Sequence, residues 1–258
     1  GIIGENLSPT IAAEYGAAFG TFLKENNKPN TVCIGRDSRP SGQMLTAAVA
    51  SGLCSVGISV IDLGIVTTPT VGIMVRYLNC GGGIVITASH NPVPYNGIKL
   101  LLDNGIAPPK PLAEKIRAMY FDKKAVPVDS ISCGKISLHD DPDTVHIEKV
   151  LSIIEKDEIS GRKFKVVLDS VNGAGGRAAV RLLNTLGCEI IEMNTEPTGL
   201  FAHTPEPIAE NLVDLCEKVK QTGADIGFAQ DPDADRLAIV DNNGTFIGEE
   251  FTLALAAK

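Results

Sequence analysis

The stretch Gly83-Ile84-Val85-Ile86-Thr87, which runs directly into Ala88-Ser89-His90-Asn91-Pro92, indicates both the fold and the position of the chemistry. Its first half is a short apolar, β-branched run bounded by glycine and proline signals, which is typical of an interior strand of a parallel sheet. Ser89 then lies on the loop at the carboxyl end of that strand, where open α/β sheets bind their ligands. A serine hydroxyl is a weak nucleophile and needs a base or a charged environment, which His90 and Lys99 could supply.

The same pattern of strand, turn and helix repeats along the chain on both sides of this strand. Such alternation is typical of crossover units in a mostly parallel sheet. We therefore predict an α/β fold with two similar three-layer domains, each built on a mixed, mostly parallel sheet. The expected strands span residues 31–35, 58–63, 83–87, 165–169, 189–193 and 225–229, with 98–102 as an edge strand that could run antiparallel. The first expected helix begins at the Ser8-Pro9 cap. The other expected helices span residues 41–56 (from a serine cap), 69–78, 144–156, 174–186 and 208–222.

A charged, proline-bearing stretch over residues 123–143 separates the two halves. We predict a first domain over residues 1–143, a second over 144–247, and the start of a third over 248–258. The chain opens without an initiator methionine and closes on a helix-forming run with no stop signal, so we expect a fragment of a longer protein. The two halves open alike, which hints at internal duplication.

A second polar cluster, Gln230-Asp231-Pro232-Asp233-Ala234-Asp235-Arg236, also follows an apolar run. Three carboxylates at alternate positions can turn toward one point, which suits a hard divalent cation with oxygen ligands. The alternative is a solvated acidic turn. An EF-hand does not fit, because Arg236 and Asn242 stand where that loop needs glycine and glutamate. A cation beside the Arg236 guanidinium would favour a phosphate ligand.

Together, the two loops resemble those of the α-D-phosphohexomutases, which move a phosphate between the 1- and 6-positions of a hexose. Residues 87–92 are similar to the phosphoserine loop of that family, and residues 231–236 to its magnesium loop. Residues 35–39 and 201–207 resemble two further segments of the family. The resemblance implies that Ser89 is the phosphoserine and that Mg²⁺ is held by Ser89 and three aspartates, Asp231, Asp233 and Asp235. It also implies that Asn91, Arg36 and Arg236 bind phosphate or hold the loop.

The implied reaction interconverts hexose or hexosamine 1-phosphate and 6-phosphate through a phosphoserine enzyme and a 1,6-bisphosphate intermediate. His90 and Lys99 are candidates for general acid and base, in an order that the residues leave open. The family has four domains, so the expected partners are a hexose phosphate and the C-terminal domains of the same chain, without which we expect no turnover. One alternative is a haloacid-dehalogenase-like phosphatase, although Asp235 stands where that family needs threonine or valine. The other is a non-catalytic module that binds a metal or sugar phosphate.

Composition restricts the class of protein further. The chain has 23 basic and 31 acidic residues, a net charge of −8, which argues against nucleic acid as a partner. A sugar phosphate would therefore need local positive charge from Arg36, Arg39, Lys99, Arg236 and the metal. No apolar run approaches a membrane span and no basic region precedes a signal core, so we expect no membrane partner. The six scattered cysteines, without a C-x-x-C pair, favour buried or partly buried free thiols in a reducing cytoplasm.

Three further segments have a structural and a functional interpretation. Residues 170–176 could hold an anion at a helix start, but the glycine spacing favours a tight structural turn. The acidic run 139–143 is expected to cap the following helix. His203 is expected to be a hydrogen-bonded loop residue, with a place in the active site as the alternative.

Overall fold

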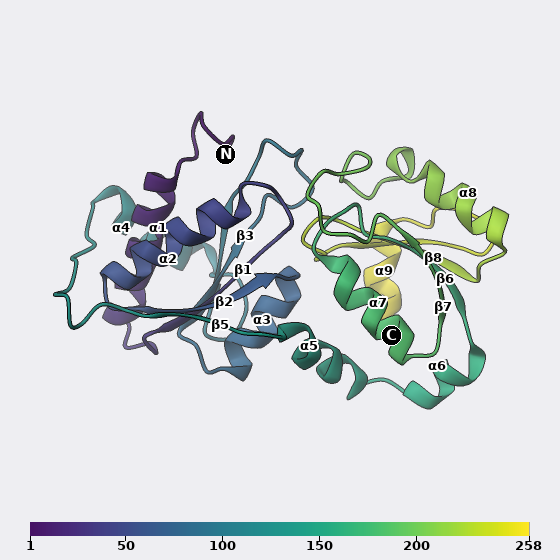
Figure 1. Cartoon of the computed structure of the whole chain (residues 1–258), viewed down its shortest axis with the longest axis horizontal. Helices are drawn as coiled ribbons and strands as arrows, with labels where there is room; N and C mark the ends of the chain where they lie inside the picture. The colour runs from purple at the N-terminus through teal and green to yellow at the C-terminus, as the bar shows by residue number, and fades with distance from the viewer. Residues whose placement is uncertain (258) are drawn as a thin grey trace. The chain divides into compact units, whose positions relative to one another are not determined.

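A computed structural model of the protein describes residues 1–257, which form two compact units (Figure 1). Unit 1 comprises Gly1–Asp37, Ser41–Ala88 and Pro94–Pro142. Unit 2 comprises Ser38–Pro40, Ser89–Val93 and the chain from Asp143 onward. Two short loops that follow strands of unit 1 therefore pack with unit 2. The domain limits expected at residues 143 and 247 stay a prediction.

Unit 1 is built on a five-stranded sheet in the order β4-β3-β1-β2-β5. Strands β1, β2, β3 and β5 are parallel, and β4 runs antiparallel to β3 at the edge. Its strands are β1 (Thr31–Arg36), β2 (Ser59–Ile65), β3 (Gly82–Ile86), β4 (Ile98–Leu102) and β5 (Ile136–Leu138). Its helices are α1 (Pro9–Glu25), α2 (Gly42–Ser55), α3 (Thr68–Tyr77) and α4 (Lys110–Phe121).

Helices cover both faces of this sheet. Buried residues of α1, α2 and α4 form one core with alternate residues of the central strands, among them Val32 and Ile34. The intervening residues face α3, since a Cβ at Gly35 would meet Val71. Helix α1 begins as expected, because the Ser8 hydroxyl accepts a hydrogen bond from the N–H of Ile11 and proline occupies the first turn.

Unit 2 is built on a four-stranded sheet in the order β7-β6-β8-β9, with β9 antiparallel. Its strands are β6 (Lys165–Asp169), β7 (Glu189–Met193), β8 (Ile226–Gln230) and β9 (Leu237–Val240). Its helices are α5 (Pro142–Leu151), α6 (Lys156–Arg162), α7 (Gly175–Thr185), the 3-10 turn η1 (Ala209–Asn211), α8 (Val213–Thr222) and α9 (Glu249–Ala256). Leu215 and Val219 of α8 share a buried core with Val167, Ala229 and Val240.

The two sheets share one topology, since β4-β3-β1-β2 corresponds to β9-β8-β6-β7. In the first sheet, β2 lies on one side of β1 and β3 on the other, and in the second sheet β7 and β8 flank β6 in the same way. The topological switch points, where such sheets bind ligands, therefore lie at the carboxyl ends of β1 and β3 and of β6 and β8. Side chains join both pairs of ends: the Thr87 hydroxyl donates to Asp37 at 2.7 Å, and the Ser170 hydroxyl donates to Gln230 at 2.9 Å.

The predicted fold class is confirmed, with two similar α/β units on mixed, mostly parallel sheets. The edge strand at 98–102 is present and antiparallel. Four elements had no clear sequence signal. Helix α4 buries only Ile116 and Met119, β5 is exposed along its length, and α6 and β9 are short. The bridging helix expected over residues 144–156 ends at Leu151 and is followed by α6.

The serine cap expected for α2 is wrong. Ser41 precedes the helix, but its side chain makes no capping hydrogen bond. Its hydroxyl instead accepts a hydrogen bond from the side-chain amide of Asn96, at 2.9 Å. The partner lies 55 residues away in the chain, so a local pattern could not have predicted it.

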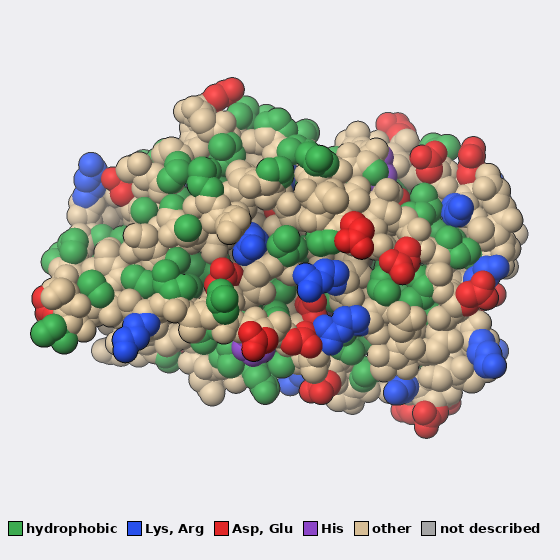
Figure 2. Space-filling model, in the orientation of Figure 1, with side chains coloured by type: hydrophobic (Ala, Val, Ile, Leu, Met, Phe, Trp, Pro, Cys, Tyr) green, Lys and Arg blue, Asp and Glu red, His purple; other side chains and the backbone are tan. Residues whose placement is uncertain are grey.

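Several expectations from composition can be compared with the structure. The six cysteines are free thiols, and one of them, Cys133, is exposed rather than buried. On the face drawn in Figure 2, lysine and arginine side chains are interspersed with aspartate and glutamate. Within residues 1–257, no helix combines the length and the apolar character that crossing a membrane requires.

Helices α1 and α2 pack closely enough to require glycine at their contact. A Cβ at Gly52 would overlap the backbone carbonyl of Ala13, and one at Gly16 would lie 2.7 Å from that of Val49. We expect Gly52→Ala to destabilise the protein by about 1–3 kcal/mol, because overpacking outweighs the gain in helix propensity. Gly161→Ala, at an exposed helical position with nothing within 4 Å, is the control and should be neutral or stabilising. Urea unfolding measures both, and equal midpoints for the two variants would contradict this packing.

Candidate active site

The Ser89 loop has an unusual backbone conformation. Ser89 follows β3 and has a φ of +52°, in the left-handed region that non-glycine residues rarely occupy. The Arg39 guanidinium donates hydrogen bonds to the carbonyl oxygens of Ser89, Asn91 and Pro92, at 2.6, 2.7 and 2.6 Å. The loop and Arg39 both belong to unit 2, so one compact unit holds the backbone of the candidate nucleophile.

Two proton acceptors lie beside the Ser89 hydroxyl. The hydroxyl donates to Oδ2 of Asp231 at 3.0 Å, and Nδ1 of His90 lies 3.4 Å away. Ser89 and His90 are half-buried, whereas Asn91 is exposed. A hydroxyl between a carboxylate and an imidazole can lose or regain its proton locally, as a group that carries and releases a phosphoryl group must do.

The three aspartates after β8 converge as the sequence predicted. One oxygen from each of Asp231, Asp233 and Asp235 lies within 4.8 Å of the others. Asp231 and Asp233 are buried and Asp235 is exposed. The turn is tight, since the N–H of Ala234 donates to the carbonyl of Asp231 at 2.9 Å and the N–H of Arg236 donates to its carboxylate at 3.1 Å.

The electrostatics of this cluster favour a cation. Burial, together with the negative charges of Asp233 and Asp235, raises the pKa of Asp231 to about 8. Like charges this close disfavour full ionisation, and a bound cation removes that penalty. The oxygen-only donor set of three carboxylates and a hydroxyl is the kind that hard divalent cations prefer.

Most of the predicted site residues belong to unit 2, and two belong to unit 1. Those in unit 2 are Ser89, His90, Asn91, Asp231, Asp233, Asp235 and Arg236. Lys99 lies in unit 1 on β4, opposite Val85. Arg36 lies at the end of β1 in the same unit, where its guanidinium is 3.6 Å from the carboxylate of Asp62. The roles expected for these two residues stay predictions.

Arg39 was expected to supply local positive charge to a sugar phosphate, but its hydrogen bonds go to the Ser89 loop. Arg39 is only 2% exposed, and its guanidinium contacts the three loop carbonyls and the ring of Phe201, whose centroid is 5.0 Å away. A buried guanidinium needs such acceptors, because an uncompensated charge in the interior is costly. The sequence around Arg36 and Arg39 does not indicate that Arg39 is the one that is buried.

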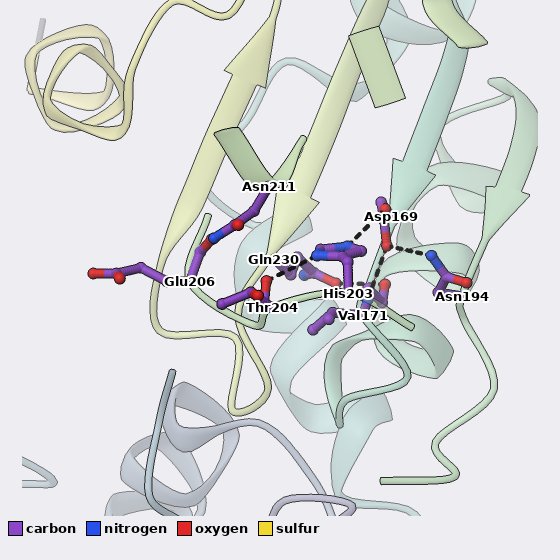
Figure 3. A network of polar contacts seen from close by, with 9 residues as sticks. Asp169, Val171, Asn194, His203, Thr204, Glu206, Asn211 and Gln230 are labelled. Carbon is purple, nitrogen blue, oxygen red and sulfur yellow. Dashed lines mark hydrogen bonds and ion pairs between the residues drawn. The ribbon is translucent and has the colours of Figure 1, made fainter. Parts of the chain in front are cut away.

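A polar network that sequence analysis did not identify joins the loop of His203 to the sheet of unit 2 (Figure 3). The carboxylate of Asp169, at the end of β6, accepts hydrogen bonds from the N–H of Val171 at 3.0 Å and the Asn194 amide at 3.1 Å. Its other oxygen accepts from Nε2 of His203 at 3.1 Å. The Nδ1 of His203 donates to the carbonyl of Thr204 at 2.9 Å. Both ring nitrogens thus face acceptors, which favours the imidazolium form.

His203 is therefore a hydrogen-bonded loop residue, as expected. Burial opposes ionisation of the ring, but the hydrogen bond and the charge of Asp169 outweigh it and raise the pKa of His203. Residues 170–176 form the structural turn that was favoured: there is no room for a Cβ at Gly173, where it would contact the backbone of Pro232. The network depends on the pairing of β6 with β7 and β8. Residues that are adjacent in the sequence do not reveal this pairing.

Two family descriptions match the chain, in an order that agrees with its two sheets. "Phosphoglucomutase/phosphomannomutase, alpha/beta/alpha domain I" matches residues 1–126, and domain II of the same description matches residues 144–244. The phosphoglucomutase/phosphomannomutase of Thermococcus kodakarensis is 42% identical over 259 residues, which cover 100% of this chain and 57% of the relative.

Two further proteins extend the comparison. The "Probable phosphoglucosamine mutase" of Pyrococcus horikoshii is 40% identical over 260 residues, covering 99% of this chain and 55% of the relative. The crystal structure of a phosphoglucomutase/phosphomannomutase family protein from Burkholderia thailandensis has a TM-score of 0.86 at 33% identity and covers 100% of this chain and 56% of that chain. The chain belongs to the α-D-phosphohexomutase family. It spans about half the length of the curated relatives it matches.

The two histidines of unit 2 with shifted pKa values predict opposite pH dependences of stability. The raised pKa of His203 means that its ion pair stabilises the fold below about pH 6.5 and that this contribution is lost as the pH rises through the folded pKa. We expect His203→Gln to lower the free energy of unfolding by roughly 1 kcal/mol at low pH and by less at high pH.

His146→Gln is the matched control in the same unit. Burial lowers the pKa of His146, so the wild-type residue loses stability relative to the variant as the pH falls. Urea unfolding between about pH 5 and 8 measures both differences. A stability difference for His203→Gln that does not change with pH would contradict the ion pair.

Proposed function

We propose that this chain supplies the phosphoryl-carrying part of a phosphohexomutase and that Ser89 is its phosphoserine. The observation that carries the proposal is the 3.0 Å hydrogen bond from the Ser89 hydroxyl to Asp231, within the aspartate cluster. A nucleophilic hydroxyl beside a cation site is the arrangement that phosphoryl transfer requires. Family membership supports the same reaction class.

The proposed reaction has two transfers. A free hydroxyl of the hexose phosphate attacks the phosphorus of phosphorylated Ser89 in line, and the bond between phosphorus and the Ser89 Oγ breaks. The hexose 1,6-bisphosphate then turns over, and the Ser89 Oγ attacks its other phosphoryl group, which releases the isomeric monophosphate. The atoms balance over the cycle, because the serine receives one phosphoryl group from the bisphosphate in exchange for the one that it gave, which stays on the product. Positioning and charge neutralisation provide most of the catalysis.

The other predicted site residues have proposed roles that follow from their chemistry. His90, with Nδ1 3.4 Å from the Ser89 Oγ, exchanges the proton of the serine hydroxyl. Lys99 is the second candidate for general acid or base, and the order of the two residues stays open. Asn91, Arg36 and Arg236 are proposed to bind phosphate oxygens or to hold the loop.

We propose Mg²⁺ as the cofactor, held by Asp231, Asp233 and Asp235 and by an oxygen on Ser89. The converging carboxylate oxygens and the nearby hydroxyl fit a small hard cation that keeps few protein ligands. When bound, Mg²⁺ neutralises the negative charge of the phosphoryl group and of the departing serine oxygen.

The two alternative functions find less support. In a haloacid-dehalogenase-like phosphatase, Asp231 would be the nucleophile, yet its carboxylate accepts hydrogen bonds from Ser89 and from the N–H of Arg236. A non-catalytic binding module would not need the hydroxyl beside the carboxylates. Intact mass separates these proposals, since one stable phosphate on Ser89 is expected only of the mutase.

The substrate class is a hexose or hexosamine phosphate. Relatives named for glucose and mannose and a relative named for glucosamine match the chain at similar identity, 42% and 40%. This similarity supports the proposal that the residues of these two units do not distinguish among these sugars. We propose that further C-terminal domains of the same protein select the sugar.

Phosphate recovered from the purified protein is expected to map to Ser89. In a complete protein that carries these residues, we expect Ser89→Ala to abolish mutase activity, because the alanine cannot carry the phosphoryl group. Ser152→Ala, at an exposed serine of the same unit, is the control and should retain both phosphate and activity. Peptide mass spectrometry and a coupled assay measure the two effects. Phosphate on another serine, together with an active Ser89→Ala variant, would refute the assignment.

The chain alone is expected to fold and bind Mg²⁺ but to turn over hexose phosphates negligibly. Binding energy from parts of the substrate remote from the reacting atoms is what holds it in line for transfer, and we propose that other domains supply most of it. A coupled assay would compare this chain with a complete protein at equal concentration. Comparable turnover would mean that these two units contain a complete active site.

A further inference from the structure

Arg39 donates hydrogen bonds to three carbonyl groups of the Ser89 loop, those of Ser89, Asn91 and Pro92. Its Nη1 donates to Pro92, and its Nη2 donates to Ser89 and Asn91. The three contacts are 2.6–2.7 Å long, within the range of charge-assisted hydrogen bonds or slightly shorter. A planar fork of donors can make this set of contacts, and the single ammonium of a lysine cannot reproduce its geometry.

The backbone of Ser89 needs such support. Its φ of +52° is a sparsely populated conformation for a residue with a Cβ, and such conformations persist only where surrounding contacts enforce them. The conformation matters because the same residue donates its hydroxyl to Asp231. If the loop relaxed toward an ordinary φ, the direction of the hydroxyl would change.

Arg39 is itself held from two sides. The ring of Phe201 lies against its guanidinium, with 5.0 Å between the Arg39 Cζ and the ring centroid. The residue before Arg39 is Ser38, and its hydroxyl donates to the carbonyl of Asn172 at 2.7 Å. Gly199, with a φ of +71°, fits against the carbonyl of Ser38, where no Cβ could be accommodated. The loop that carries Phe201 also carries His203, which is fixed to Asp169.

We propose that Arg39 is a positioning residue that keeps the Ser89 Oγ directed at the aspartate cluster, and that the Phe201 ring is its support. This inference rests on the proposed function for its kinetic consequence, although its structural consequence can be measured without any activity. Because Arg39 is buried and contacts the loop backbone, its loss should slow phosphoryl transfer rather than weaken binding of the sugar phosphate.

The structural test is hydrogen exchange on this chain. We expect Arg39→Lys to increase exchange in peptides covering residues 89–93 by roughly tenfold, because opening of the loop becomes easier. Phe201→Leu leaves the fork of donors intact and should give a smaller increase in the same peptides. Arg177→Lys makes the same chemical change at an exposed position of unit 2 and should change nothing there.

The kinetic test uses a complete protein with the same substitutions. Arg39→Lys should lower kcat roughly 10- to 100-fold with little change in KM, as expected for a nucleophile displaced by a fraction of an ångström or more. Normal exchange and normal kcat in a folded Arg39→Lys protein would overturn the proposal. If Arg39→Lys does not fold, unchanged exchange and kcat in Phe201→Leu would overturn it. Faster exchange in a protein whose wild type lacks phosphate on Ser89 would retain the positioning role and refute the proposed function.

Discussion

The hydrogen bond between the Ser89 hydroxyl and the Asp231 carboxylate is the interaction on which the rest of the site depends. It joins two loops that are 142 residues apart in the sequence and follow two different sheets. The bond forms within one compact unit, because residues 89–93 belong to unit 2 although they follow β3. The proposed carrier of the phosphoryl group and the candidate ligands of a cation are thereby brought together.

Charge explains why the site is arranged in this way. The protein is acidic overall, and its aspartate cluster disfavours full ionisation when no cation is bound. Two basic side chains of unit 2, those of Arg39 and His203, hold loop structure in place. Arg39 binds loop carbonyls, and His203 pairs with Asp169 at the end of β6. The carboxylates of the aspartate cluster are candidate ligands of a metal ion, while Arg39 and His203 hold the backbone and side chains of neighbouring loops.

The local parts of this arrangement could be predicted from the sequence, and the partners of individual side chains could not. The runs leading to Ser89 and to Asp231 identify strand ends, and α/β sheets bind their ligands at such ends. Arg36 and Arg39 differ by three positions, yet one pairs with Asp62 and the other is enclosed around the Ser89 loop. That difference depends on long-range packing. The same holds for Ser41, whose hydroxyl binds Asn96 rather than the start of its own helix.

We propose that a phosphate on Ser89 and the aspartate cluster bind one cation together. The most direct measurement is the phosphorus NMR spectrum of this chain, phosphorylated on Ser89, during titration with Mn²⁺ as a paramagnetic replacement for Mg²⁺. We expect the phosphoserine resonance to broaden fully by one equivalent of metal, and we expect the Asp233→Asn variant to need a large excess of metal for the same broadening. A resonance that stays sharp at one equivalent while the metal is bound, or one that broadens equally in Asp233→Asn, would contradict this proposal.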